Sequence, residues 1–285
     1  MSRPLGYGLV ICGGGCTQME HAIGCIKAIQ RIHNVKFDEV RGTSAGAIVG
    51  SMLMSWDQDI ERFEKLIKDV PIYEWFTISP FAAIKSLFSK SNHIADADHL
   101  AECLHKYITK ESWSKVKVAI SEMDDGKFVK AHLVDGRPEH VIASMSFQHV
   151  FPPVMIDGKE YQDGGVNDNI PIPSYLDIAR YEHLYIVLAP STPLLPSIPR
   201  WKFLDRLFNT IDNTMNRELA QIEQLHLEEL LNVSVLKPEK WVDSAKFLDW
   251  SENFEQIDAS YELAKSVLLQ SDNANQASFP ALGGN

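Results

Sequence analysis

The feature that most constrains this chain is a serine set between two glycines where an extended segment changes to a helical one. The motif reads Gly42-Thr43-Ser44-Ala45-Gly46; a short strand-like run at residues 37–40 precedes it, and residues 47–54 have helical character. In such a turn the serine backbone is held in strained dihedrals, and the glycines let strand and helix approach, so the hydroxyl projects into an open site. The motif therefore predicts that Ser44 is a nucleophile.

Three consecutive glycines, Gly13, Gly14 and Gly15, follow a buried strand pattern at residues 7–12 and precede a helical pattern at residues 19–32. Their backbone N–H groups can turn toward one point beside the positive end of the helix dipole, where an oxygen becoming anionic would be held. A phosphate loop is the alternative, but neither Gly-Lys-Ser/Thr nor a G-x-G-x-x-G spacing is present. We expect these amides to form an oxyanion hole beside the nucleophile.

Asp163 is followed by two glycines, a pattern that by default indicates a turn. A serine hydroxyl must lose its proton as it attacks. A carboxylate in a poorly solvated pocket, with its pKa raised from about 3.9, can accept that proton without a histidine between them. We therefore consider Asp163 a candidate general base, with glycines that let the serine and the substrate come close.

Four blocks of the chain together resemble the patatin-like phospholipases, a family of lipid acyl hydrolases built on a Ser-Asp dyad. Two of them are the glycine loop and the serine motif. The others are residues 151–158, Phe-Pro-Pro-Val-Met-Ile-Asp-Gly, and residues 163–171, Asp-Gly-Gly-Val-Asn-Asp-Asn-Ile-Pro. Their order and approximate spacing match the family, and the resemblance covers about residues 7–190.

This resemblance implies a fold and a reaction. The fold is α/β, with three α/β/α layers and a central mixed, mostly parallel sheet. The reaction is hydrolysis of a lipid acyl ester, as in a phospholipase A or an esterase. Ser44 would attack the carbonyl, Asp163 would take its proton, and the amides of Gly13 to Gly15 would hold the oxyanion. Water would then clear the acyl-enzyme, with no cofactor, and a protein activator is left open.

The chain departs from the family beside the glycine loop. The family usually follows its glycines with a small residue, then Arg or Lys, then Gly, whereas this chain has Cys16-Thr17-Gln18. If that cation normally shapes the loop or attracts a phosphate-bearing substrate, its replacement by Thr17 favours a neutral lipid or a simple ester. An alternative function also follows, in which a catalytically weakened relative binds a lipid or a partner protein as a scaffold.

Length and composition suit one large α/β domain. The chain has 285 residues, of which 45% are apolar, and this is enough for a substantial core. We expect the domain to span residues 1–270. Residues 271–285 are rich in Asn, Ala, Ser and Gly, and we expect them to form a disordered tail.

Charge and hydropathy restrict the partners. The net charge of -11 argues against nucleic acid and gives no general attraction to an anionic bilayer. No stretch reaches the roughly 18 apolar residues of a transmembrane helix, and the first residues lack the layout of a signal peptide. We expect a cytoplasmic protein that meets its lipid or ester substrate at a membrane surface through local, apolar, peripheral contact.

Four cysteines, Cys12, Cys16, Cys25 and Cys103, fit a reducing compartment, because disulfides among the first three would distort the glycine loop. We expect small buried residues and no metal site, since the spacings do not match zinc ligation. Cys16 lies at the start of a helix, where the pKa of a thiol can fall. An oxidation-sensitive or nucleophilic role for Cys16 is therefore an alternative.

The rest of the chain shows further periodic segments. Residues 115–122 and 127–134 alternate like strands around the turn signal Asp124-Asp125-Gly126, so the sheet should be mixed. The segment between the serine motif and residue 115 is expected to cap the site. Strands are also expected at residues 183–188 and 232–236, and helices at residues 45–56, 58–68, 81–88, 96–107, 201–231 and 254–269.

The segment at residues 193–204 has two interpretations. It combines prolines and leucines with Trp201, which is flanked by Arg200 and Lys202. This composition suits an interfacial lid or a membrane foot, and it equally suits a proline loop whose apolar side chains pack on the body of the protein.

Histidines offer an alternative to the dyad. An ordinary α/β hydrolase uses a histidine that follows its aspartate in the chain, and His183 and His226 both follow Asp163. His183 opens a strand expected to be buried, and His226 lies in a helical pattern where a packed or surface histidine is the common case. His21 and His149 are also expected to be structural. The sequence favours the dyad.

Overall fold

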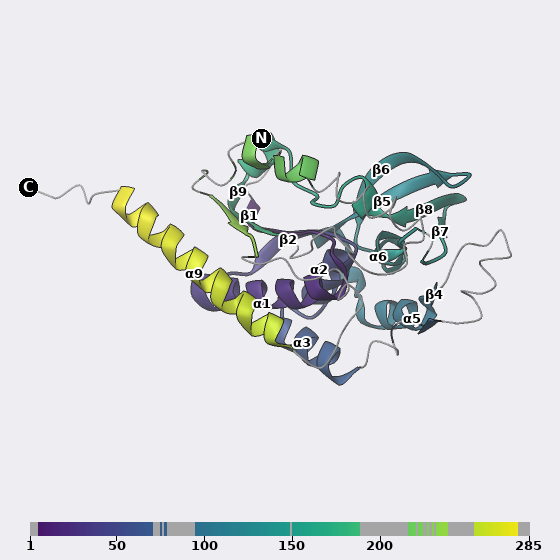
Figure 1. Cartoon of the computed structure of the whole chain (residues 1–285), viewed down its shortest axis with the longest axis horizontal. Coiled ribbons are helices and arrows are strands. Elements are labelled where there is room, and N and C mark those ends of the chain that lie inside the picture. The colour runs from purple at the N-terminus through teal and green to yellow at the C-terminus, as the bar shows by residue number, and fades with distance from the viewer. Residues whose placement is uncertain are drawn as a thin grey trace, which may run out of the picture.

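A mixed β-sheet lies at the centre of the protein (Figure 1). Five of its strands run parallel, in the order β10-β9-β1-β2-β5. They are β1 (Leu5–Ile11), β2 (Phe37–Thr43), β5 (Val116–Asp124), β9 (Tyr181–Val187) and β10 (Val233–Leu236). The structure is a computed structural model, and it describes residues 5–70, 75, 77–78, 95–148, 150–188, 216–220, 222–224, 227, 230, 232–238 and 254–278.

Three antiparallel strands extend this sheet around β5. They are β6 (Lys127–Asp135), β7 (Val154–Ile156) and β8 (Lys159–Asp163). β6 pairs with β5 through a hairpin in which Asp125 and Gly126 have φ values of 48° and 70°, the left-handed conformation that such a turn requires. β8 pairs with the second half of β5, and β7 pairs with β8. The expected mixed sheet and its hairpin are therefore confirmed.

The strand β5 changes its pairing partner on one side halfway along its length, and this change brings the C-terminal ends of β2 and β8 together. Its first half pairs with β2 as far as Thr43, which lies opposite Ala119. Its second half pairs with β8, in which Asp163 lies opposite Ile120. Thr43 and Asp163 therefore lie opposite consecutive residues of β5, and Ser44 follows Thr43 directly.

Helices cover both faces of the sheet. Side chains of β1 alternate between two cores, as period-two alternation requires: Leu9 and Ile11 belong to the larger core, and Val10 and Cys12 to the smaller one. Helices α1, α2, α3, α5, α6 and α9 contribute to the larger core, whereas α7 and residues 222 and 227 contribute to the smaller one. This arrangement confirms the three α/β/α layers. The helices are α1 (Gly15–His33), α2 (Ala45–Ser55), α3 (Ile60–Asp69), α5 (Asp98–Tyr107), α6 (Pro138–Met145), α7 (Tyr175–Ile178) and α9 (Glu255–Ser278).

Short elements complete the described chain. They are the 3-10 turns η2 (Lys110–Lys115) and η3 (Gly164–Val166) and the antiparallel pair of β3 (Thr77–Ile78) with β4 (Ala95–Asp96). In the segment expected to cap the site, the helix expected at residues 81–88 lies outside the described residues. None of the described helices is both long and apolar enough to cross a bilayer.

Two helix boundaries differ from expectation by more than two residues. The first helix begins at Gly15 rather than at residue 19, so Cys16, Thr17 and Gln18 form its first turn instead of a loop. The last helix continues to Ser278 rather than ending at residue 269, and it enters the segment expected to be a disordered tail. Of the helix expected at residues 201–231, the structure describes helical stretches at 216–220 and 222–224. Residues 193–204 lie outside the described chain.

Helix α1 packs closely against α9, as Figure 1 shows. A Cβ atom added at Gly24 would lie 2.3 Å from the carbonyl oxygen of Ile257, so this contact needs a glycine. His21 is fully buried beside it, with Nδ1 2.8 Å from the Ser260 hydroxyl. Burial lowers the pKa of His21 from 6.5 to about 4, which keeps the ring neutral. His21 therefore has the structural role that the sequence suggests.

Candidate active site

Ser44 occupies the turn between β2 and α2 with a strained backbone, as the motif predicts. Its φ of 53° and ψ of -120° are uncommon for a residue with a side chain. A Cβ atom at Gly46 would lie 2.3 Å from the carbonyl oxygen of Ile11, so the glycine allows α2 to approach β1 closely. The Ser44 carbonyl accepts hydrogen bonds from the amides of Ala47 and Ile48, which starts the helix.

A second serine, which the sequence does not single out, supports the Ser44 backbone. The Ser44 amide donates to the hydroxyl of Ser144 at 2.8 Å, and that hydroxyl donates to the carbonyl of Ala119 at 2.7 Å. Ser144 lies in α6 and is fully buried. Ser144 therefore connects the turn at Ser44 to β5, at the point where the pairing partner of β5 changes from β2 to β8.

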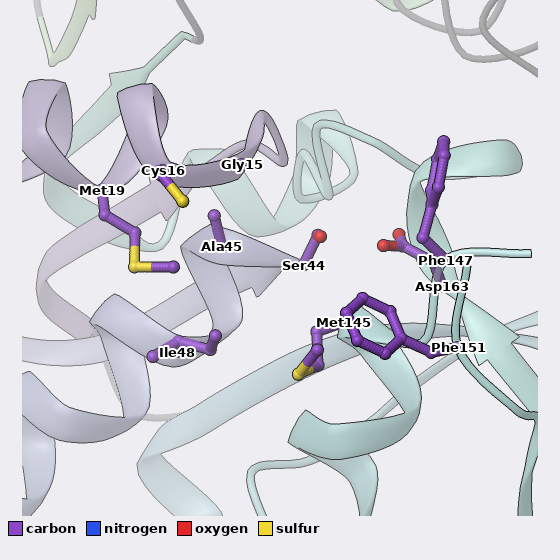
Figure 2. Close-up of a pocket in the computed structure, with 10 residues that line it drawn as sticks. All are labelled: Gly15, Cys16, Met19, Ser44, Ala45, Ile48, Met145, Phe147, Phe151 and Asp163. Atoms are coloured by element: carbon purple, nitrogen blue, oxygen red, sulfur yellow. The ribbon is translucent and has the colours of Figure 1, made fainter. Parts of the chain in front are cut away.

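Asp163 ends β8, and its carboxylate faces the Ser44 hydroxyl (Figure 2). The side chain is buried, and Oδ1 accepts a hydrogen bond from the Gly165 amide at 2.7 Å. Burial raises the pKa of Asp163 from 3.8 to about 7, although the Gly165 amide and the Ser44 hydroxyl oppose this rise. A carboxylate with such a pKa can accept a proton near neutral pH, which an ordinary exposed aspartate does poorly.

The glycine loop lies between β1 and α1. The Gly13 amide donates to the carbonyl of Asn169 at 3.1 Å, so this N–H is already engaged. The amides of Gly14 and Gly15 donate no hydrogen bond within the described chain, and they lie at the N-terminal end of α1. Of the three glycine amides, that of Gly13 is thus bound to Asn169, whereas those of Gly14 and Gly15 are available to an anion at the end of the helix. The oxyanion hole itself stays a prediction.

Thr17 and Gln18, which stand where the family has a basic residue and a glycine, are buried in the first turn of α1. The Thr17 hydroxyl donates a hydrogen bond to the Gly14 carbonyl at 3.3 Å, and this bond connects the helix to the glycine loop. The side-chain amide of Gln18 is fully buried, and neither its oxygen nor its nitrogen has a hydrogen-bond partner in the described structure. A buried amide without a partner is expected to lower the free energy of unfolding.

Ser44 and Asp163 open into a pocket with mostly apolar walls (Figure 2). The pocket has about 400 Å³ of empty space, part of which is open to solvent. Sulfur-containing and aromatic side chains dominate its lining. Besides the two candidate catalytic residues, the lining consists of Gly15, Cys16, Met19, Ala45, Ile48, Met145, Phe147 and Phe151. Such walls suit a hydrocarbon chain whose ester group reaches the polar end.

The histidine alternative is not supported by the described residues. His183 lies near the start of β9, opposite Tyr7 in β1, whereas Ser44 follows the far end of β2. Its Nε2 is 2.9 Å from the Ser234 hydroxyl. A triad through His183 is therefore wrong. His226 and His149 lie outside the described residues.

The cysteines and acidic groups do not form a metal centre in the described chain, where no cluster of three or more His, Cys, Asp or Glu side chains could hold an ion. Cys12, Cys16 and Cys25 are buried, as predicted, and Cys103 is half-buried. Cys16 lines the pocket near Ser44 (Figure 2). Its expected oxidation sensitivity stays a prediction.

Comparison with known proteins places these features in context. The family model described as patatin-like phospholipase matches residues 9–176. Lysophospholipase NTE1 of Candida albicans is 26% identical over 171 residues, which are 58% of this chain and 12% of the relative. Lysophospholipase NTE1 of Eremothecium gossypii is 24% identical over 172 residues, 58% of this chain and 11% of the relative. The chain thus corresponds to a small part of these relatives.

A solved structure has a similar fold. VipD from Legionella pneumophila superimposes with a TM-score of 0.51 at 14% sequence identity. The match covers 96% of this chain and 67% of the VipD chain. At this identity the likeness concerns the fold, and it agrees with the layered α/β architecture described above.

Proposed function

Because the chain belongs to the patatin-like phospholipase family, we propose that it is a lipid acyl hydrolase that cleaves carboxylic esters with a Ser44–Asp163 dyad. The observation that carries the proposal is the buried Asp163 carboxylate, which faces the Ser44 hydroxyl at the polar end of an apolar pocket. Family membership alone would support lipid hydrolysis in general. The geometry of these two side chains supports a direct proton transfer between them.

The first half of the reaction forms an acyl-enzyme. The Ser44 oxygen attacks the ester carbonyl while its proton passes to Asp163, and the carbonyl oxygen becomes an oxyanion. The amides of Gly14 and Gly15, at the positive end of α1, would hold that oxyanion. Collapse of the intermediate breaks the ester C–O bond, and protonated Asp163 returns the proton to the leaving alcohol.

The second half of the reaction releases the fatty acid. Asp163, again a carboxylate, takes a proton from a water molecule that attacks the Ser44 ester. The same two amides hold the second oxyanion, and its collapse returns the proton to Ser44. Throughout the cycle the pKa of Asp163, about 7, makes it both a usable base and a usable acid near neutral pH.

The pocket and the relatives suggest a substrate class. Apolar side chains such as Met145, Phe147 and Phe151 suit a fatty acyl chain. The printed names of the two lysophospholipase relatives point to lysophospholipids, lipids with one acyl chain. In contrast, Thr17 stands where the family has a cation, and this favours neutral lipids or simple esters. We propose single-chain lipid esters at a membrane surface, reached by a cytoplasmic protein through peripheral contact.

Hydrolysis assays with matched variants test this function. The purified protein, Ser44→Ala and Asp163→Asn are compared on p-nitrophenyl butyrate, lysophosphatidylcholine micelles and monoacylglycerol. Asp125→Asn, in the exposed β5–β6 turn, is the control for the aspartate change. Both site variants should lose at least about a hundredfold in kcat while Asp125→Asn keeps full activity. An inactive parent would favour the alternative of a lipid-binding or protein-binding scaffold.

A further inference from the structure

The segment at residues 167–170 contacts both halves of the proposed site. The carbonyl of Asn169 accepts the Gly13 amide at 3.1 Å, and the Asn169 side-chain amide donates to the Gly13 carbonyl at 3.4 Å. The Thr43 hydroxyl donates to the carbonyl of Asp168 at 2.8 Å. This segment is therefore tied to the glycine loop and to the residue that precedes Ser44.

A buried carboxylate holds this segment from its other side. Glu218 is 5% exposed, and its two oxygens accept hydrogen bonds from the consecutive amides of Asn169 at 3.0 Å and Ile170 at 2.9 Å. Two parallel bonds to one carboxylate fix the orientation of the peptide as well as its position. Next to it, Arg217 donates to the carbonyl of Asn167 at 3.0 Å. The segment thus has little freedom to shift.

The carboxylate at this position is energetically costly. Burial and the nearby charge of Asp168 raise the pKa of Glu218 to about 8, while the two amides and Arg217 act in the opposite direction. An apolar side chain would avoid this cost, but it would leave two buried amides without an acceptor. What the carboxylate supplies is a fixed peptide at Asn169, and that peptide holds Gly13.

We propose that Glu218 is a positioning residue for the oxyanion hole. Through the Asn169 peptide it anchors Gly13, and this sets the direction of the adjoining Gly14 and Gly15 amides relative to Ser44. Packing at Gly13 is tight enough to transmit a shift. A Cβ atom there would lie 2.5 Å from the Asn169 side-chain oxygen and 3.2 Å from the Ser44 Cβ. Glu218 is not among the residues that line the pocket, and the proposal rests on the proposed function.

Kinetics of Glu218→Gln test the proposal against its neighbour Glu223→Gln, which changes an exposed glutamate close by. Gln keeps the size of Glu218, but its side-chain NH2 group faces one of the two backbone amides and cannot accept a hydrogen bond from it. On p-nitrophenyl butyrate at about pH 9, above the pKa of Glu218 so that its carboxylate is ionised, we expect kcat to fall about tenfold or more, with KM within about twofold of the parent. Glu223→Gln should match the parent. An unchanged kcat, or a rise in KM in place of the fall, would overturn the proposal.

An inhibitor separates positioning from a general structural effect. The Ser44 oxygen adds to the carbonyl carbon of an alkyl trifluoromethyl ketone. The ketone oxygen then becomes an oxyanion in the oxyanion hole, as in the transition state. Its affinity for Glu218→Gln should fall by the same factor as kcat/KM. If affinity for the ketone is kept while kcat falls, Glu218 does not act through the oxyanion hole.

Hydrogen exchange tests the same connection without relying on activity. In Glu218→Gln the amides of Asn169, Ile170 and Gly13 should exchange faster than in the parent and in Glu223→Gln. Unchanged exchange at Gly13 would overturn the proposal even if the parent hydrolyses no ester, an outcome that would contradict the proposed function separately. Should Glu218→Gln fail to fold, Thr43→Val removes the bond to Asp168 and should show the same fall in kcat at constant KM. Unchanged kcat in Thr43→Val would then overturn it.

Discussion

Ser44 and Asp163 are each held in a state that costs the folded protein free energy. The backbone of Ser44 has a φ of 53° and a ψ of -120°, a conformation whose strain is of the order of 1–3 kcal/mol. Asp163 is buried where its ionised form is disfavoured. Residues distant in sequence hold both backbones: the Ser144 hydroxyl accepts a hydrogen bond from the Ser44 amide, and the Ser146 carbonyl accepts one from the Asp163 amide. Reactivity at this site therefore depends on the surrounding fold.

The pKa of Asp163 predicts how activity depends on pH. The base must be ionised to accept the Ser44 proton, so kcat/KM should rise with pH, with a midpoint of about 7, and then level off. A histidine would titrate at a similar pH. The two differ in temperature dependence, because a carboxyl group ionises with almost no enthalpy change whereas an imidazolium ionises endothermically. The midpoint of the pH profile should therefore stay nearly constant between about 10 and 40 °C. A midpoint that falls steadily on heating would indicate a histidine.

The same pKa predicts a stability effect. The folded pKa of about 7 lies above the ordinary value of 3.8, so the unfolded chain releases the proton first as pH rises. The free energy of unfolding should fall between about pH 4 and pH 7, by up to about 4 kcal/mol from this group. Asp163→Asn has no carboxyl group to titrate at this position, so this fall in the free energy of unfolding is absent from the variant. In urea unfolding, its stability relative to the parent should be greater at pH 8 than at pH 5.

The parent and Asp163→Asn share every other titrating group, including Glu218, so those contributions largely cancel in the difference. A difference in unfolding free energy that is the same at pH 5 and pH 8 would contradict the raised pKa of Asp163.

At the scale of elements, helix α1 connects the site to the body of the protein. Its first turn provides Cys16 to the pocket wall and Thr17 to the glycine loop, while its middle packs on α9. The helix begins at Gly15 with no side-chain cap on its N-terminal amides. An end without such a cap is suited to binding an anion, and this is the role proposed for the Gly14 and Gly15 amides.

The buried amide of Gln18 makes a prediction about this helix. Because its polar atoms lack partners in the described structure, Gln18→Met should raise the free energy of unfolding by about 1–2 kcal/mol. Gln30→Met, on the same helix, is the contrast. It removes a hydrogen bond to the Gln58 carbonyl and should lower stability. Urea unfolding measures both. If Gln18→Met is the less stable of the two, Gln18 has a partner that this structure does not describe.

The start of α1 shows one limit of reading elements from sequence. The helical pattern is clear from residue 19. Cys16, Thr17 and Gln18 carry neither a capping signal nor an exposed polar face, so their sequence predicts a loop where the structure has the first helical turn. Helix α6 carries a sequence signal of its own. Pro138 occupies its first turn, a position that proline favours. The last helix is expected to end at residue 269 because the polar composition past that point resembles a tail, whereas the helix continues to Ser278.

At the scale of the whole molecule, local motifs were predictable and long-range contacts were not. Ser44 and Asp163 each sit in a short motif with its own chemical logic, and the alternation of residues 115–134 indicated the hairpin. The exchange of β2 for β8 along β5, which sets the two residues beside each other, has no local signature. Ser144 lies 100 residues from Ser44 and is one serine among many.

The hydrogen bonding of the glycine loop also depends on a long-range contact that has no local signature. Three glycines suggested three free amides, yet the Gly13 amide is bound by Asn169, a residue 156 positions away along the chain. Glu218, which holds Asn169, looked like one polar residue in a long helical pattern. Such contacts depend on how separate elements meet in the tertiary structure, and a single sequence does not reveal them.

The most direct test of the central claim is covalent labelling of the whole protein with an alkyl fluorophosphonate, followed by intact-mass measurement and peptide mapping. The dyad predicts one adduct per chain, on Ser44, with labelling slowed by at least about a hundredfold in Asp163→Asn. Ser44→Ala should take up no label, and Asp125→Asn should label like the parent. Labelling on Cys16 or another residue, or equal rates with and without the Asp163 carboxylate, would contradict a Ser44–Asp163 dyad.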